Sequence, residues 1–157
     1  GSELLDASAE TLLRDELLPR ATLITPNLPE AAKLLDCLPA QTDEEMIEQA
    51  RSIQRLGATA VLLKGGHASG TECVDILVTN AITQLSATRI NSKNTHGTGC
   101  TLSAAIAACL ADGKDLIEAV RSAHAYVHNA IAHADALALG RGHGPVHHFY
   151  AHEALAT

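Results

Sequence analysis

The chain of 157 residues is long enough for one compact domain with its own core and too short for two of ordinary size. Apolar residues make up 46% of it and aromatic residues only 2%, so the core has to be built from Ala, Leu, Ile and Val. A formal net charge of −7 at pH 7 opposes binding to nucleic acid or to an anionic membrane, and we expect neither as a partner.

The cysteines indicate a reduced, intracellular protein. No C-x-x-C spacing occurs among Cys37, Cys73, Cys100 and Cys109, which is typical of free thiols rather than of a disulfide framework. No signal-like segment is present, and the apolar stretches are broken before the roughly 20 residues that a bilayer span needs. We therefore expect a cytoplasmic protein without disulfides.

The first part of the chain predicts helices that alternate with short strands. Leucines at helical spacing, β-branched apolar runs, proline stops and an acidic first turn after Thr42 are the signals. The predicted elements are a helix over 4–18, a strand over 21–25, a helix over 29–38, a helix over 42–57 and a strand over 60–64.

The second part predicts an antiparallel hairpin and then helices. The hairpin turns at Thr79-Asn80, and Gly113 is a typical cap after a helix. The predicted elements are strands over 73–78 and 82–90 and helices over 98–111, 116–137 and 147–155. This order favours an α/β fold in which helices flank a largely parallel sheet with an inserted hairpin.

A glycine loop, defined here as residues 94–100 (N-T-H-G-T-G-C), lies between the hairpin and the next helix. Gly97 and Gly99 let the backbone turn so that successive N–H groups face one point, and the helix dipole adds partial positive charge there. The loop therefore predicts an anion hole for a phosphoryl group. It matches neither G-x-x-x-x-G-K-[ST] nor G-x-G-x-x-G, which disfavours Walker-type NTPases and dinucleotide folds.

Cys100 occupies the first turn of that helix, where the dipole favours the thiolate form of a cysteine. It is therefore a candidate base or nucleophile. The alternative is that the glycines make a tight strand-to-helix turn and that Cys100 packs as a small hydrophobic residue.

Polar residues also follow both predicted strands of the first part. Asn27 and Glu30 lie three residues apart at a helix start, where they could hold a hydrated Mg²⁺ or could form a plain N-terminal cap. Lys64 precedes Gly65, Gly66 and His67 after the second strand. Because ligands of open α/β sheets bind at the carboxyl ends of strands, these segments favour a common site.

Four segments together resemble the hydroxymethylpyrimidine/phosphomethylpyrimidine kinases of thiamine biosynthesis, which are ribokinase-like kinases. They are Thr25–Ala31, Leu63–His67, Lys93–Ala105 and Gly142–Val146. The resemblance implies a ribokinase-like layered fold, ATP and Mg²⁺ as cofactors, and ATP-dependent phosphorylation of hydroxymethylpyrimidine and of its monophosphate.

The resemblance also implies roles for individual residues. Cys100 would be the base that takes the proton from the substrate hydroxymethyl group, and Asn27 and Glu30 would organise Mg²⁺ through water. The anion-hole residues would be Gly97, Thr98 and Gly99, and the residues near the ATP phosphates would be Asn27, Glu30, Lys64, Thr95 and His96.

Members of this family carry a further N-terminal half. Residues 1–157 are therefore expected to be the C-terminal, ATP-binding and catalytic part of a single ribokinase-like domain, which by itself binds ATP weakly and turns over no substrate. We expect the parent enzyme to be a homo-oligomer. The alternatives are a pyridoxal kinase of the same Cys-bearing subgroup and a non-catalytic fragment. A zinc module at His124 and His128 is disfavoured because no pattern completes a four-ligand set.

Overall fold

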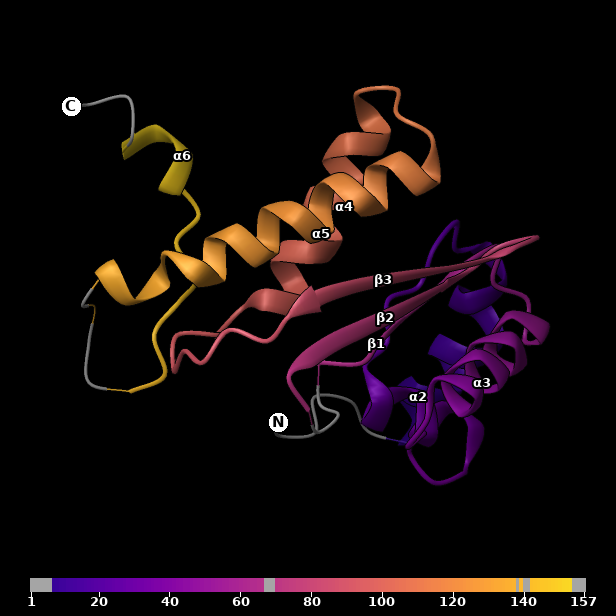
Figure 1. Ribbon diagram of the computed structural model, residues 1–157. Coiled ribbons are helices and arrows are strands. Elements are labelled where there is room, and N and C mark those ends of the chain that lie inside the picture. The colour runs from indigo at the N-terminus through magenta and orange to yellow at the C-terminus, as the bar shows by residue number, and fades with distance from the viewer. Residues whose placement is uncertain (1–6, 67–69, 138, 140–141, 154–157) are drawn as a thin grey trace. The chain divides into compact units, whose positions relative to one another are not determined.

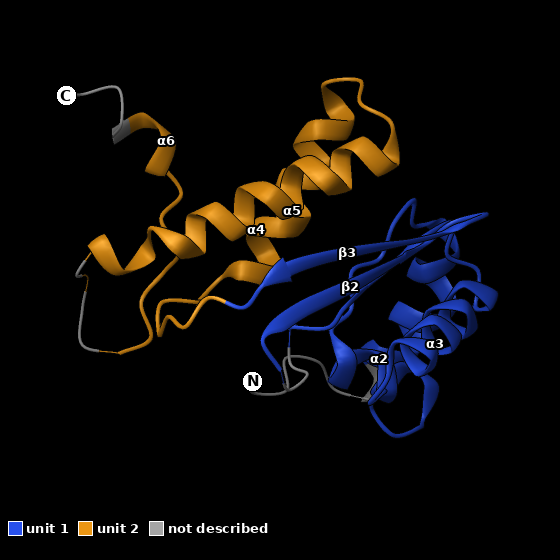
Figure 2. Cartoon of the chain, in the orientation of Figure 1, with its two compact units in different colours: residues 1–89 blue, residues 90–157 orange. Residues whose placement is uncertain are grey.

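The computed structural model describes residues 7–66, 70–137, 139 and 142–153 of the chain (Figure 1). The chain divides into two compact units, Gly1–Arg89 and Ile90–Thr157 (Figure 2). Each unit has its own secondary structure and its own buried residues, and each is considered by itself. No helix among the described residues is long and apolar enough to cross a membrane.

Three helical segments of unit 1 match the predicted helices, and residues 4–6 of the first prediction lie outside the described residues. Helix α1, Ala7–Leu12, continues into a π-helical turn, Leu13–Leu17, and a 3₁₀ turn, Leu18–Arg20. Helix α2 covers Leu28–Leu35 and helix α3 covers Asp43–Arg55.

The ends of α2 and α3 have local causes. Helix α2 stops before the predicted residue 38 because Asp36 takes a left-handed conformation with φ 51°. Helix α3 begins as predicted, since Thr42 Oγ1 accepts a hydrogen bond of 3.2 Å from the Glu45 N–H.

The sheet of unit 1 contains strands β1, Val61–Lys64, β2, Glu72–Val78, and β3, Ile82–Thr88, in the order β1-β2-β3. Strand β2 pairs antiparallel with both neighbours, which confirms the predicted hairpin.

The predicted strand over 21–25 is an extended segment that pairs parallel to β1 through isolated bridges, Ile24 with Val61 and Asn27 with Lys64. The Leu62 N–H donates to Ile24 O and the Lys64 N–H donates to Pro26 O. Because Pro26 has no N–H, the ladder cannot continue as a full strand. The parallel part of the predicted sheet is therefore short.

Helices α2 and α3 cover one face of this sheet (Figure 1). The core between them contains Ile53 from α3, Val61 and Leu63 from β1 and Ile76 from β2, all with no exposed surface. Burial of each such side chain contributes roughly 1.5–3 kcal/mol. This packing holds the ends of β1 and of the segment 21–27 in place.

Unit 2 contains helix α4, Thr98–Ala111, as predicted, and helix α5, Leu116–Ala132, which lie side by side (Figure 1). A 3₁₀ turn follows over Ala134–Leu137, and a short helix α6 covers Tyr150–Glu153. The predicted continuous helix over 116–137 was wrong at its end. His133 ends α5, and the Ala136 N–H donates to His133 O in the tighter turn.

Candidate functional site

The glycine loop starts α4 with an unusual cap. Gly97 occupies the N-cap position with φ 83° and ψ 4°, a left-handed conformation that suits glycine, and no side chain caps the helix. The Thr101 N–H and its Oγ1 both donate to Gly97 O, at 2.8 and 2.7 Å. Among the described residues no acceptor takes the N–H groups of Gly99 and Cys100. These groups point out of the helix start, as an anion site requires.

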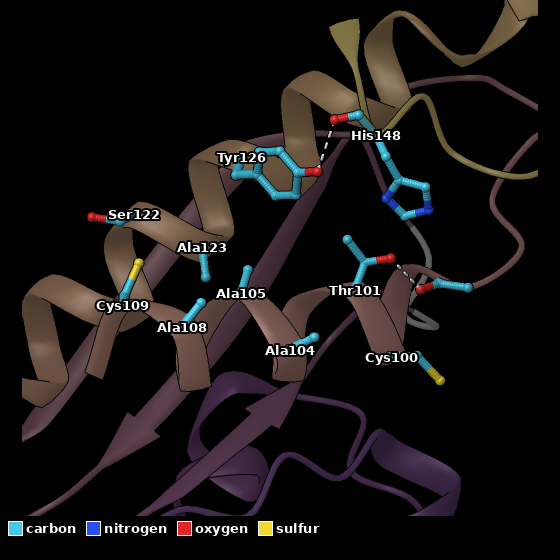
Figure 3. Close-up of a pocket in the computed structure, with 11 residues that line it drawn as sticks. Cys100, Thr101, Ala104, Ala105, Ala108, Cys109, Ser122, Ala123, Tyr126 and His148 are labelled. Atoms are coloured by element: carbon cyan, nitrogen blue, oxygen red, sulfur yellow. Dashed lines mark hydrogen bonds between the residues drawn. The ribbon is translucent and has the colours of Figure 1, made fainter. Parts of the chain in front are cut away.

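Cys100 is exposed at this helix start. Figure 3 shows its sulfur directed away from the other labelled side chains. The alternative that it packs as a small hydrophobic residue therefore does not describe this chain. All four cysteines are free.

A hydrogen-bond network fastens the base of the glycine loop. Asn94 donates through Nδ2 to Asp135 Oδ1 at 2.9 Å and to Ala134 O at 3.4 Å, and its Oδ1 accepts from the Gly144 N–H at 3.0 Å. Ser92 Oγ donates to the same Asp135 Oδ1 at 2.5 Å and accepts from the Asn94 N–H at 3.0 Å.

The C-terminal tail, defined as residues 142–146, runs beside this loop. His96 and Pro145 form a parallel bridge in which the His96 N–H donates to Gly144 O at 3.1 Å. Two of the four sequence motifs, the glycine loop and the tail, are therefore neighbours in unit 2.

An open groove between α4 and α5 begins at Gly97 and Cys100 and has a volume of about 750 Å³. Small side chains of α4 form its floor, Ala104 and Ala108 among them (Figure 3). Cys109 and Ser122 line its other end, and the Tyr126 hydroxyl, which also lines the groove, donates to His148 O at 2.9 Å (Figure 3). The groove is mainly apolar and adjoins the unpartnered N–H groups.

In unit 1, Asn27 and Glu30 form a capping box at the start of α2. Asn27 Oδ1 accepts from the Glu30 N–H, and Glu30 Oε2 accepts from the Asn27 N–H, each at 2.8 Å. The plain cap considered from the sequence is thus present. Glu30 is exposed, and its Oε1 lies outside the box.

Lys64 is the bridge partner of Asn27, so two predicted site residues of unit 1 lie beside each other, at the end of β1 and at the end of the extended segment 21–27. The residue after it, Gly65, donates its N–H to the buried Asp75 carboxylate at 2.9 Å. A Cβ on Gly65 would lie 2.0 Å from Val74 O, so only glycine fits there. His67 of the same motif lies outside the described residues.

Sequence reasoning missed three residues that hold these segments. They are Asp75, Asp135 and Arg89, whose guanidinium donates to Gly66 O and Gly70 O. A carboxylate inside the apolar run of β2 was a usable signal for Asp75. No comparable signal marked Asp135, which contacts a residue 41 positions away.

The predicted site residues thus fall into two groups. Unit 1 carries Asn27, Glu30 and Lys64, and unit 2 carries Thr95, His96, Gly97, Thr98, Gly99 and Cys100. In the described part of the chain, no cluster of three or more His, Cys, Asp or Glu side chains could hold a metal ion, and this includes the surroundings of His124 and His128.

Solved structures define the class of the protein. Pyridoxal kinase of Bacillus subtilis, solved as an ADP complex, matches with a TM-score of 0.88 at 35% identity, over 96% of this chain and 58% of that one. Phosphomethylpyrimidine kinase of Clostridium difficile matches with a TM-score of 0.69 at 37% identity, over 83% of this chain and 52% of that one. The ribokinase-like fold, incomplete in this chain, is thereby confirmed.

Sequence relatives define the family. Residues 1–147 match the phosphomethylpyrimidine kinase family, and the chain belongs to it. Hydroxymethylpyrimidine/phosphomethylpyrimidine kinase of Rhizobium meliloti is 52% identical over 151 residues, which cover 96% of this chain and 57% of that protein. The chain therefore spans little more than half the length of this relative, and the resemblance seen in the four motifs is confirmed.

Proposed function

We propose that this chain supplies the ATP-binding and catalytic part of a kinase that phosphorylates hydroxymethylpyrimidine and its monophosphate. The observation that carries the proposal is the start of α4, where a left-handed glycine, two unpartnered N–H groups and an exposed thiol follow one another within four residues. Family membership supplies the substrate class.

The N–H groups of Gly99 and Cys100 have the role of binding the oxygens of the phosphoryl group in transfer. Backbone dipoles fixed at this point stabilise charge without reorganising during the reaction. Cys100 Sγ takes the proton of the substrate hydroxymethyl group. The freed oxygen then forms a bond to the γ-phosphorus of ATP, and the bond from that phosphorus to the bridging oxygen of ADP breaks.

The groove along α4 and α5 is the proposed place of the nucleoside part of ATP. Its apolar floor of alanines suits a base and a ribose ring, and it begins at the same residues that face the phosphates. Thr95 and His96 belong to the loop at its mouth, and we assign them to the phosphate end of the nucleotide.

Asn27 and Glu30 would hold Mg²⁺ through bound water, which is the manner in which this ion is commonly bound beside phosphates. The capping box leaves the exposed Glu30 Oε1 available for such a water. Within the described ranges, no group of three or more His, Cys, Asp or Glu side chains is placed to bind an ion directly. When bound, the ion neutralises charge on the ATP phosphates. Lys64 adds a cation beside Asn27.

The proposal includes a cytoplasmic, homo-oligomeric enzyme that acts on small molecules and on neither nucleic acid nor membranes. The net charge of −7 supports the absence of polyanionic partners.

A competition assay tests the substrate class. The full-length gene product that contains these residues is assayed for ADP release with hydroxymethylpyrimidine, its monophosphate and pyridoxal. We expect kcat/KM for the two pyrimidines to exceed that for pyridoxal at least about tenfold, the difference of roughly 1.4 kcal/mol that pocket contacts readily supply. A preference for pyridoxal would instead assign the pyridoxal kinase activity named for the Bacillus subtilis structure.

A further inference from the structure

Both ends of the Asn94 side-chain amide form hydrogen bonds within unit 2. Its two amide hydrogens go to Asp135 Oδ1 and Ala134 O, and its oxygen accepts from the Gly144 N–H. The Gly144 donor and the Asp135 acceptor allow one orientation of the amide only. Its residue type is therefore specified by two partners of opposite polarity.

The tail is fastened to the glycine loop on both sides of Thr95. Asn94 holds the Gly144 N–H, and the His96 N–H donates to the Gly144 carbonyl. Gly144 has no room for a side chain, because a Cβ there would lie 2.3 Å from Asn94 Oδ1. Gly142, in the same tail, has nothing within 4 Å of its Cβ position.

The network also joins the loop to the end of α5. Asp135 lies in the 3₁₀ turn that follows this helix, and it accepts from both Asn94 and Ser92. The residue next to it, Ala134, is fully buried. The Asp135 carboxylate and the Ala134 carbonyl thus anchor the loop to the turn that follows α5.

We infer that Asn94, held between Asp135 and Gly144, is a positioning residue that fixes the glycine loop so that the N–H groups of Gly99 and Cys100 face one phosphoryl group. The inference rests on the proposed kinase function. The contacts of the Asn94 side chain are with protein groups of unit 2, so the inference assigns it no contact of its own with nucleotide or substrate. It acts through residues 95–97, which connect it to the start of α4.

The first test reverses the polarity of the Asn94–Asp135 pair in the full-length gene product. Asn94→Asp keeps the acceptor for Gly144 but places two carboxylates in contact. We expect kcat with hydroxymethylpyrimidine to fall about 100-fold, the cost of a displacement of about 1 Å at an anion hole, while KM for ATP changes less than about threefold. The double variant Asn94→Asp with Asp135→Asn restores a donor opposite an acceptor and should recover at least about tenfold of that loss.

A merely structural role predicts a different pattern. Equal changes of kcat and of KM for ATP, or no recovery in the double variant, would overturn the inference. Should Asn94→Asp fail to fold, Gly144→Ala and Gly142→Ala serve instead. Gly144→Ala should lower kcat by at least about tenfold, because the added Cβ displaces the Asn94 side chain. Gly142→Ala is the matched control and should keep the wild-type kcat. Equal kcat values for these two variants would also overturn it.

Amide hydrogen exchange separates this inference from the proposed function. In Gly144→Ala we expect the His96 and residue-144 amides to exchange at least about tenfold faster than in the wild type, and in Gly142→Ala at the wild-type rate. If the wild-type enzyme phosphorylates no pyrimidine, the proposed function fails. The exchange rates alone then decide whether Asn94 and Gly144 hold the glycine loop in place. Wild-type exchange rates of the His96 and residue-144 amides in Gly144→Ala would overturn the inference, whatever the activity of the enzyme.

Discussion

The two units hold their site residues by different means. Unit 1 buries large side chains, Ile53, Leu63 and Ile76 among them, against a sheet whose strand end carries Lys64. In unit 2 the buried residues of α5 are mainly alanines, and hydrogen bonds of Asn94 and Asp135 hold the glycine loop.

This difference has a functional consequence. In unit 1 the strand end that carries Lys64 depends on apolar packing, and a helix cap holds Asn27 and Glu30, so changes that disturb these residues also lower the free energy of unfolding. In unit 2 the anion-hole loop depends on polar contacts near the surface, so single polar changes can reduce turnover while the fold persists. Five predictions probe this contrast.

The largest expected effect is that of Cys100→Ala in unit 2. Loss of a general base should reduce kcat about 10³-fold while leaving ATP affinity nearly unchanged, because the backbone N–H groups remain. Steady-state kinetics and ATP titration of the full-length protein measure both, with Cys37→Ala, an exposed cysteine of unit 1, as the control. Equal losses of kcat and of ATP affinity would make Cys100 a structural residue and would remove the contrast.

Core truncations should cost more in unit 1 than in unit 2. Leu63→Ala should lower the free energy of unfolding by about 3 kcal/mol because it leaves a cavity between β1 and the helices, whereas Val120→Ala in α5 should cost about 2 kcal/mol because fewer atoms are removed. Urea unfolding compares the two. A larger loss for Val120→Ala would show that unit 2 also depends on tight apolar packing.

Gly65→Ala should cost about 2 kcal/mol, because the added Cβ meets Val74 O at 2.0 Å and the strand end has to shift. Gly66→Ala is the matched control, since nothing lies within 4 Å of its Cβ position. Thermal unfolding should therefore separate two adjacent glycines. Similar melting temperatures for the two variants would contradict the close approach of β1 to β2 at this point.

Variants of Asn27 test whether the N-cap residue of α2 also helps to bind hydrated Mg²⁺. Asn27→Ala should lose about 1 kcal/mol of stability, and Asn27→Ser should retain it, because serine is an equally good N-cap. If the amide also orders hydrated Mg²⁺, both variants should raise KM for MgATP. A normal KM in Asn27→Ser would leave Asn27 with the cap alone.

The smallest effect concerns the exposed Glu48–Arg55 pair on α3. The pKa of Glu48 lies below its ordinary value of 4.5, first because the Arg55 guanidinium donates a hydrogen bond to the carboxylate and second because of the Arg55 charge. The lowered pKa means that any stabilisation is present above the unfolded pKa and is lost as pH falls through the folded one. Glu48→Gln should therefore lower the melting temperature slightly at pH 7 and not below the folded pKa. High salt should remove the difference at pH 7 because it screens an exposed pair.

Local sequence signals predicted most of the elements. The hairpin of β2 and β3 and helices α3 and α4 follow from alternation, helical spacing, the cap Thr42 and the turn at Thr79-Asn80. These signals are reliable because they act on the backbone of the same few residues. They fail at ends that depend on distant partners, as where α5 gives way to a 3₁₀ turn that presents Asp135 to Asn94.

The sequence by itself determined that a helix with Cys100 in its first turn starts at Thr98, directly after the glycines of the loop, and it identified the kinase family from four short motifs. Only the tertiary structure decided what holds that loop. The partners of Asn94 are Asp135 and Gly144, which lie 41 and 50 positions further along the chain. The Gly65 N–H, directly after β1, donates a hydrogen bond to Asp75 in the neighbouring strand β2. Such contacts form because packed helices and strands bring distant side chains together, and no local preference of the backbone encodes them.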